Sequence, residues 1–432
     1  MQRVRALIEA GELRPAADAL NQLQKHAPQD PRMFLLGMRL AERAGNQDGA
    51  IDAARRALRL APDWHVAQIE LALRLAQKKP AEDALRNEAM QLAVQALAQH
   101  PQDPEVMSGA INVAMYSERA DQTLAWAEEG VRRFPDSLGI RLFLARYLVS
   151  LDRQADAVEI YEYIHEQAPN NDEALRGLVR AALRAEDSER ARDWADAWLT
   201  RKPDSDEARY WHALAYGKTP ETQPSVMVTG LFDGAAANFD LHMVRGLQYR
   251  VPERVAQILL EKHPDRRFDL LDLGCGTGLV GVYLGRINGY IAGVDLSQKM
   301  IDQAARHQIY SRFHRVNVLD ALRDTSDGVY QAITCADVLI YVGDLAPVIP
   351  NAYRILKDGG HFIFSCETAD EDEEDLVLRP TSRYAHKRSA VERQLQDAGF
   401  DDIVVEELPA LRTEGGEPIP GFLVTARKPP AA

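Results

Sequence analysis

Six prolines recur through the first half of the chain at an almost constant spacing. The steps between them are 34, 39, 34, 34 and 34 residues, and they lie at Pro28, Pro62, Pro101, Pro135, Pro169 and Pro203. Each follows a helical pattern of apolar residues, and an Asp or Asn comes within two residues of it. Because proline ends a helix and an Asp or Asn side chain can cap the next one, the spacing predicts a stack of two-helix repeats.

The 34-residue period with two helices per unit resembles the tetratricopeptide repeat (TPR). Small residues stand where that family packs its two helices together, although the fourth unit has a threonine: Ala16, Ala50, Thr123, Ala157 and Ala191. The resemblance implies an all-α superhelix with a groove that binds a protein or peptide. The alternative is a scaffold that serves self-association or covers the rest of the chain.

The chain is too long for one ordinary core, so at least two domains are expected. The repeats predict a helical domain over residues 1–217, and residues 218–225 are rich in turn-forming residues and read as a linker. A second domain is then expected over residues 226–432.

Three glycines at alternate positions follow an apolar run near the start of this second domain. Residues 268–273 read as a buried strand, the glycines are Gly274, Gly276 and Gly278, and a helical pattern starts at Leu279. Such a turn lets backbone N–H groups approach a ligand. Its spacing differs from the G-x-G-x-x-G of pyrophosphate sites, and Asp272 would repel a pyrophosphate but attract an ammonium group.

Two further acids follow later apolar runs. Asp295 ends the run 291–295, where a carboxylate can accept hydrogen bonds from both ribose hydroxyls. Asp320 ends the stretch 315–320 and could accept a hydrogen bond from an adenine amino group. In the alternative interpretation these acids only cap strand ends beside a tight turn. Together the three acids favour a nucleoside that carries an ammonium group, as S-adenosylmethionine (SAM) does.

On these residues the segment from about 225 to 432 resembles a Rossmann-type (class I) SAM-dependent methyltransferase, and with the repeats the chain resembles a group of bacterial TPR-containing methyltransferases. The resemblance implies an α/β domain with a seven-stranded sheet, a lid helix in the lead-in 231–252, and SAM as the cofactor. The residues implied to contact the cofactor are Asp272, Gly274, Cys275, Gly276, Thr277, Gly278, Asp295, Leu296, Met300, Asp320, Ala321 and Asp337.

The methyl acceptor is expected at the end of the fourth strand, in the stretch 331–341 that reads as this strand and its exit, because ligands of parallel sheets lie at the carboxyl ends of strands. Tyr341 and His386 are the candidate catalytic residues there, with His386 as a base near the start of a helix predicted from Ser382. Candidate substrate-binding residues are Tyr249, Arg250 and Tyr384. The alternatives are that His386 faces solvent and that Tyr249 and Arg250 only pack an amphipathic helix.

Composition excludes several other classes of function. A net charge of −14 argues against general binding of a phosphate backbone. The sequence also lacks two motifs that would indicate DNA methylation, an Asn-Pro-Pro-Tyr motif after the fourth strand and a Pro-Cys pair. The three cysteines form no C-x-x-C pair or cysteine–histidine cluster, so no structural metal is expected. Without a signal peptide or a run of ~20 apolar residues, the sequence predicts a cytoplasmic protein.

The predicted function is the transfer of a methyl group from SAM to a protein or peptide recruited by the repeats. Two alternatives stay open: a small-molecule methyltransferase whose repeats serve assembly, and a non-catalytic adaptor that binds SAM. Displacement at a sulfonium mainly requires a positioned nucleophile, so the chemistry demands no particular base. The sequence does not identify the accepting atom or the oligomeric state.

Overall fold

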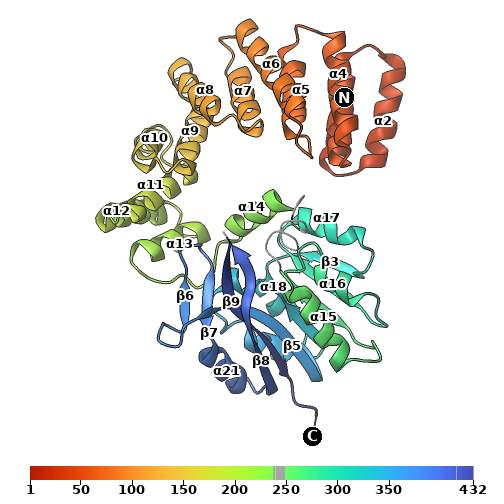
Figure 1. Cartoon of the computed structure of the whole chain (residues 1–432), viewed down its shortest axis with the longest axis vertical. Helices are drawn as coiled ribbons and strands as arrows, with labels where there is room; N and C mark the ends of the chain where they lie inside the picture. The colour runs from red at the N-terminus through yellow and green to blue at the C-terminus, as the bar shows by residue number, and fades with distance from the viewer. Residues whose placement is uncertain (237–238, 240–248, 415, 432) are drawn as a thin grey trace. The chain divides into compact units, whose positions relative to one another are not determined.

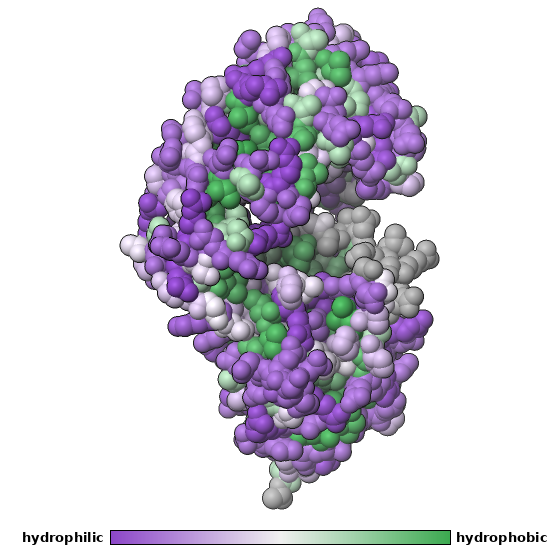
Figure 2. All heavy atoms as spheres, turned by 60° about the vertical axis from the view of Figure 1, so that its left-hand side comes forward, coloured by the Kyte–Doolittle hydropathy of each residue, from purple (hydrophilic) through white to green (hydrophobic). Residues whose placement is uncertain are grey.

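The computed structural model describes residues 1–236, 239, 249–414 and 416–431 (Figure 1). The chain forms two compact units, Met1–Glu186 and Asp187–Ala432. Hydrophilic side chains make up most of the surface that faces the viewer in Figure 2. Within the described ranges, no helix is both long enough and apolar enough to cross a bilayer.

The first unit consists of helices that pack in consecutive pairs. They are α1 (Gln2–Glu9), α2 (Leu13–His26), α3 (Pro31–Arg43), α4 (Gln47–Leu60), α5 (His65–Gln77), α6 (Asp83–Gln99), α7 (Pro104–Tyr116), α8 (Ala120–Arg133), α9 (Leu138–Ser150), α10 (Gln154–Gln167) and α11 (Asp172–Arg184). A core of alanine and leucine side chains, such as Ala54, Leu71 and Ala93, runs between neighbouring helices.

The recurring prolines act at the helix ends as predicted. Pro28, for example, follows the end of α2, and the Asp30 side chain then caps α3 by accepting a hydrogen bond from the N–H of Arg32. Asn171 caps α11 in the same way. The small residues predicted at the helix contacts are all buried, including the threonine of the fourth repeat.

The second unit begins with two more helices of the repeat pattern and continues into an α/β domain. Its helices are α12 (Ser188–Arg201), α13 (Asp206–Ala215), α14 (Ser225–Ala235), α15 (Val251–Lys262), α16 (Leu279–Leu284), α17 (Gln298–Arg306), α18 (Val318–Asp324), α19 (Leu339–Val342), α20 (Ile349–Ile355) and α21 (Arg388–Asp397). Its strands are β1 (Leu270–Leu273), β2 (Ile291–Asp295), β3 (Arg312–Arg315), β4 (Tyr330–Cys335), β5 (Leu356–Ala369), β6 (Leu376–Leu378), β7 (Tyr384–Lys387), β8 (Asp401–Glu414) and β9 (Glu417–Arg427).

The sheet is parallel at its centre, in the order β3-β2-β1-β4-β5. Beyond β5 it divides: β9 pairs antiparallel with residues 361–367 of β5 and carries β8, whereas β7 pairs with the last residues of β5 and carries β6. The strand order reverses between β1 and β4. In open α/β sheets, ligands bind outside the carboxyl ends of the strands at such a reversal.

Helices cover both faces of this sheet. Successive strand residues point to opposite faces, so Leu271 packs with α18, α20 and α21, whereas Leu270 packs with α15 and α16. The sheet therefore lies between two apolar layers that fix the carboxyl ends of β1, β2 and β4.

The structure corrects three details of the sequence interpretation. Nine strands occur in the described part of the second unit instead of seven, because β6 and β7 were not predicted and residues 384–387 form a strand before the helix that begins at Arg388. The third strand lies at 312–315. Of the stretch 315–320 that was predicted to end in Asp320, residues 318–320 belong to α18. The helix at the start of the predicted lead-in 231–252 is α14, which begins earlier, at Ser225, and ends at Ala235. Residues 237–238 and 240–248 of the lead-in, His242 among them, lie outside the described residues.

Candidate active site

The glycine turn after β1 folds as it does because two of its positions need glycine. Gly274 has φ of 65°, and a Cβ there would lie 2.2 Å from a methyl group of Val338. Gly276 also has positive φ, at 53°, but a Cβ would meet nothing within 4 Å. The first position therefore needs glycine for both space and backbone conformation, and the second for backbone conformation alone. This turn brings the backbone close to the carboxyl ends of β1, β2 and β4.

Asp272 lies beside this turn and is almost fully buried. Its Oδ2 accepts a hydrogen bond of 2.5 Å from the phenol of Tyr310, and its Oδ1 accepts one of 2.7 Å from the hydroxyl of Thr334. Burial raises the pKa of this carboxyl to about 6, against the opposing effect of the two hydroxyl donors. At neutral pH the site thus holds a buried negative charge without a basic partner among these contacts.

Asp295 lies at the end of the neighbouring strand β2 and links it to the same turn. Its Oδ2 accepts from the N–H of Gly276 at 2.9 Å, and its Oδ1 accepts from the N–H of Ser297 at 2.8 Å. Burial raises its pKa, while the backbone donors oppose that shift. Two carboxylates therefore flank the glycine turn at the strand-order reversal.

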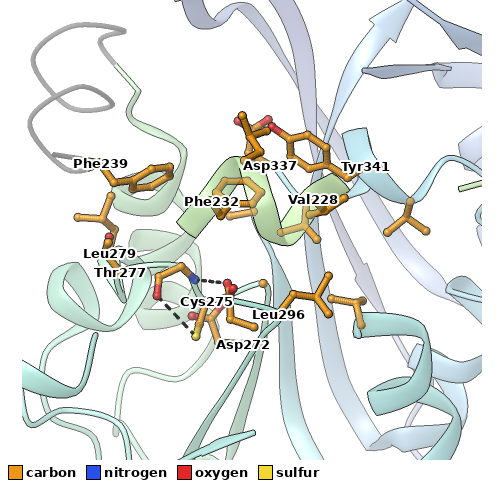
Figure 3. Close-up of a pocket in the computed structure, with 18 of the residues that line it drawn as sticks. Val228, Phe232, Phe239, Asp272, Cys275, Thr277, Leu279, Leu296, Asp337 and Tyr341 are labelled. Atoms are coloured by element: carbon orange, nitrogen blue, oxygen red, sulfur yellow. Dashed lines mark hydrogen bonds between the residues drawn. The ribbon is translucent and has the colours of Figure 1, made fainter. Parts of the chain in front are cut away.

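A cavity of about 270 Å³ opens above these residues (Figure 3). Much of its wall is apolar and comes from α14, the start of α15 with Tyr249 just before it, and the start of α16; it includes Val228, Leu231, Phe232, Pro252 and Val280. In Figure 3, Phe232 and Val228 lie on α14 above the turn that carries Cys275. The ring of Phe232 meets that of Tyr341 edge to face, with centroids 5.4 Å apart.

Helix α14 is tied to the loops beneath it at both ends. The Ser297 hydroxyl donates to Oδ1 of Asp233 at 2.5 Å near its C-terminal end. At its N-terminal end the Asn317 side-chain amide donates to the Ser225 hydroxyl at 2.9 Å. These bonds hold the apolar face of α14 over the cavity, and α14 overlaps the lid predicted over 231–252 at residues 231–235.

The structure brings most of the predicted site residues to this one cavity. Those that line it are Asp272, Gly274, Cys275, Gly276, Thr277, Asp295, Leu296, Asp337, Tyr341 and Tyr249. Gly278 caps the start of α16 just behind the turn. Met300 is buried in α17, where its N–H donates to the Ser297 hydroxyl.

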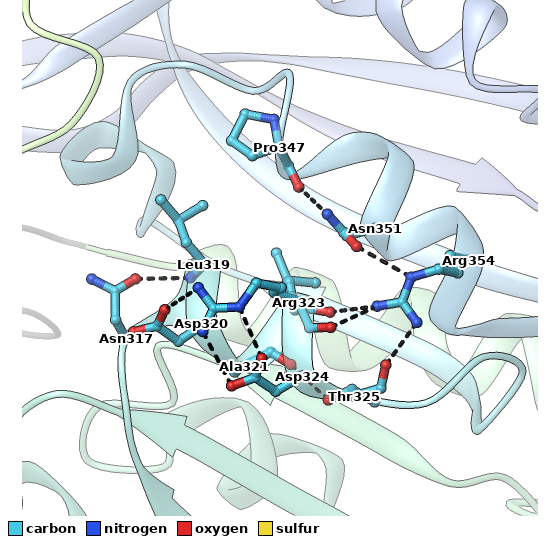
Figure 4. A network of polar contacts seen from close by, with 11 residues as sticks. Asn317, Leu319, Asp320, Ala321, Arg323, Asp324, Thr325, Pro347, Asn351 and Arg354 are labelled. Atoms are coloured by element: carbon cyan, nitrogen blue, oxygen red, sulfur yellow. Dashed lines mark hydrogen bonds and ion pairs between the residues drawn. The ribbon is translucent and has the colours of Figure 1, made fainter.

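Asp320 and Ala321 lie outside this cavity, contrary to their predicted role. The Asn317 side chain accepts from the N–H of Leu319 and so begins α18 before Asp320 is reached. Asp320 instead forms an ion pair of 2.8 Å with Arg323, within the polar network drawn in Figure 4. Asn317 lines the cavity at the position where Asp320 was expected.

Three of the predicted catalytic and substrate-binding residues are not among those that line the cavity: Arg250, Tyr384 and His386. His386 is buried in β7, its Nε2 lies 2.6 Å from the carbonyl oxygen of Gly343, and burial lowers its pKa to about 4. Tyr384 is fully buried on the same strand. Arg250 is exposed and pairs with Glu253. A solvent-facing His386, the alternative interpretation, is equally wrong.

Sequence reasoning missed a buried ion cluster at the far end of the cavity. Arg412 from β8 is 2% exposed, and its guanidinium pairs with Asp337 at 2.9 Å, Glu367 at 2.5 Å and Glu414 at 2.6 Å. Arg383 also pairs with Glu414. Asp337, Arg383 and Arg412 all line the cavity. Because these residues come from distant segments, no local spacing in the sequence reveals the cluster.

The arrangement separates two chemical environments. Around the glycine turn the charged groups are acidic, which suits a ligand with an ammonium group and hydroxyl donors. At the other end, two guanidinium groups are balanced by three carboxylates, with the phenol of Tyr341 beside them. A phosphate chain would meet the buried charges of Asp272 and Asp295 instead of a basic side chain.

Comparison with protein families assigns both parts of the chain. Residues 1–63 and 148–215 match models of the tetratricopeptide repeat, and residues 271–364 match a model of a methyltransferase domain. The matched methyltransferase segment includes Asp272, the glycine turn, Asp295 and Asp337.

Relatives of known name match part of the second unit. The ubiquinone biosynthesis O-methyltransferase of Alkalilimnicola ehrlichii is 31% identical over 99 residues, which are 22% of this chain and 40% of that enzyme. The enzyme of the same name from Nitrosomonas europaea is 29% identical over 128 residues, 29% of this chain and 52% of the enzyme. This chain thus spans about half the length of these relatives or less. Among solved structures, that of the [4+2]-cyclase SpnF is 19% identical, covering 49% of this chain and 98% of the cyclase, with a TM-score of 0.41.

Proposed function

We propose that this chain, which joins tetratricopeptide repeats to a methyltransferase domain, transfers the methyl group of SAM to a protein or peptide acceptor. The observation that carries the SAM assignment is the pair of buried carboxylates, Asp272 and Asp295, on either side of the glycine turn. An ammonium group and two ribose hydroxyls are the partners that such carboxylates recognise, and a pyrophosphate is not.

Each of these side chains would contact a different part of SAM. Asp272 would hold the ammonium group of the methionine moiety, and the two hydroxyls that donate to it would keep its carboxylate in place. Asp295 would accept from the ribose hydroxyls, with Leu296 and Asn317 beside the adenine. Bound there, SAM supplies an electrophilic methyl group on a sulfonium.

At the acceptor end of the cavity, Asp337 and Tyr341 are the polar side chains best suited to assist a nucleophile. Arg412 donates to Oδ1 of Asp337 at 2.9 Å, and Asp337 lines the cavity, so its carboxylate could accept the proton that the nucleophile releases. Asp337 has a positive φ of 57°, which is costly for a residue with a side chain and is typical of functional positions. The nucleophile would form a bond to the methyl carbon as the sulfur–methyl bond breaks.

Recruitment by the repeats supports a protein or peptide acceptor. Stacked helical repeats present extended surfaces that bind other chains, and repeats match at both ends of the first 215 residues. A small-molecule acceptor is the second candidate. It is favoured by the apolar wall that α14 contributes to the cavity and by relatives whose names are those of small-molecule O-methyltransferases.

Radiolabelled SAM incubated with the purified full chain and a cell lysate tests both candidates. We expect label in the protein fraction, and the Asp295→Ala variant serves as the control in which it is lost. Label found only in the small-molecule fraction would support the second candidate. A chain that binds SAM but labels neither fraction would act as an adaptor, and the proposal of an enzyme would be wrong.

A further inference from the structure

The segment that joins the repeats to the methyltransferase domain forms part of the wall of the cavity. Thr222 and Gln223 line it, at the same end as Tyr341 and Arg383. The sequence predicts this segment only as a linker, and linkers are ordinarily solvated and make few contacts. Here Gln223 is 8% exposed, which is unusual for a polar residue between two domains.

The backbone of this segment is bonded to the loop that carries Tyr341. The carbonyl oxygen of Tyr341 accepts from the N–H of Gln223 at 3.0 Å and from the hydroxyl of Thr222 at 3.3 Å. The N–H of Asp344 donates to the carbonyl oxygen of Glu221 at 2.8 Å. Two backbone bonds and one side-chain bond therefore fix the segment along α19.

Glycine at position 343 makes this close approach feasible. It has φ of 76°, and a Cβ there would lie 2.4 Å from the carbonyl oxygen of Glu221 and 3.0 Å from the ring of Tyr384. The linker, the loop after α19 and the strand β7 thus meet at one point where only glycine fits.

The side chain of Gln223 connects this loop to a second element of the site. Its amide Nε2 donates to the carbonyl oxygen of Ser382, the residue before Arg383. Arg383 lines the cavity and pairs with Glu414. Gln223 consequently holds together the backbone at Tyr341 and the backbone at Arg383, the two sides of the acceptor end.

The same region is continuous with the last repeat helix. Burial, and to a smaller extent the nearby Tyr210 of α13, raises the pKa of Tyr384. Tyr384 in turn packs against Gly343, which lies against Glu221. The last helix of the repeat pattern therefore leads to the acceptor end through the chain that follows it, of which Thr222 and Gln223 line the cavity.

From these contacts we propose that residues 221–223 complete the methyl-acceptor site and that Gln223 is a positioning residue for acceptor binding. The inference rests on the proposed function, because it assigns the Tyr341 end of the cavity to the acceptor. Its consequence is that acceptor affinity depends on the linker, whereas SAM affinity depends on the glycine turn at the other end.

The test compares two full-length variants, Gln223→Met and Lys218→Met. Methionine has nearly the length of glutamine but cannot donate to the carbonyl of Ser382, and Lys218 is exposed on the same linker. For Gln223→Met we expect an apparent KM for the labelled lysate fraction about tenfold higher than in the unmodified chain, the effect of one lost hydrogen bond. Its SAM affinity, measured by calorimetry, should match that of Lys218→Met.

Amide hydrogen exchange supplies a readout that needs no acceptor. Exchange should be faster in Gln223→Met than in Lys218→Met for peptides covering 338–344 and 382–387. If both variants have the same apparent KM and the same exchange, the inference is overturned. If Gln223→Met fails to bind SAM, Thr222→Val takes its place in the comparison, because that variant removes only the hydrogen bond of one hydroxyl group. If the unmodified chain labels no acceptor, the proposed function is wrong. The exchange measurement then shows by itself whether residues 221–223 hold the segments 338–344 and 382–387 in place.

Discussion

The phenol of Tyr310 donates a hydrogen bond of 2.5 Å to the carboxylate of Asp272. The phenol also accepts from the N–H of Gly281 at 3.2 Å, so Tyr310 connects the acid at the end of β1 to the first turn of α16. This connection fixes a buried charge beside the glycine turn. The affinity of the site for a cation should therefore follow the ionisation of Asp272.

We expect SAM affinity to depend on pH with a midpoint near 6. Burial raises the pKa of Asp272 from 3.8 to about 6. Only the ionised form attracts an ammonium group, so affinity should be constant above pH 7 and fall about tenfold per unit below the pKa. Calorimetric titrations between pH 5 and 8 would measure this.

The Tyr310→Phe variant removes a donor that stabilises the ionised carboxylate and should move the midpoint to higher pH. The same raised pKa means that ionisation of Asp272 costs the folded state free energy, so its contribution to stability is lost as the pH rises from about 4 to 6. An affinity that does not change between pH 5 and 8 would contradict the assignment of Asp272 to the ammonium group.

Asp295 and Asp320 should differ sharply when each is replaced by alanine. Asp295 lines the cavity and fixes Gly276, so its loss should weaken SAM binding by about 1.5–3 kcal/mol. Asp320 pairs with Arg323 outside the cavity, and its replacement should change the affinity by about twofold at most. Equal losses in the two variants would mean that α18 lies differently in the SAM complex.

Much of this site could be predicted from sequence because its first half is local. Asp272 and the three glycines stand within seven residues, 272–278, and the strand before them and the helix after them are equally short-range. The prediction of a TPR array followed by a methyltransferase domain is confirmed by the family comparisons and the strand order.

The errors have physical causes that a single sequence hides. Asp320 was misplaced because the cap at Asn317 starts a helix where the apolar run suggested a strand. His386 was misplaced because it lies in β7, a strand that pairs with the end of β5 and with β6, where the sequence suggested a helix from Ser382. The cluster around Arg412 and the contacts of Gln223 join residues that are up to 159 positions apart, beyond any spacing rule.

Replacement of Gly274 by alanine should destabilise the domain by at least about 2 kcal/mol, because the new methyl group would collide with Val338 and the backbone conformation would be strained. Thermal unfolding would measure the loss. The double variant with Val338→Ala should recover part of it. Gly276→Ala, which meets no neighbour, should cost only the strain of its positive φ, about 1–2 kcal/mol. A loss for Gly274→Ala no larger than this would show that the collision is relieved elsewhere.

Arg412→Met should destabilise the second unit by about 3–5 kcal/mol, since it leaves the carboxylates of Asp337 and Glu367, each less than 10% exposed, without their shared cation. The matched control is Arg427→Met. Its pair with Asp401 is more than one third exposed, so this variant should unfold at nearly the same temperature as the unmodified chain. Scanning calorimetry would compare the two variants. Similar unfolding temperatures would show that water or rearrangement compensates the buried cluster.

The central claim is that the cavity after β1 binds a nucleoside with a cationic amino-acid end. Calorimetric titration of the purified full chain with SAM and, separately, with NAD tests it most directly. We predict saturable binding of SAM at pH 7.5, with affinity reduced by about 1.5–3 kcal/mol in Asp272→Ala, and no binding of NAD. Binding of NAD in place of SAM, or SAM affinity unchanged in Asp272→Ala, would contradict the account.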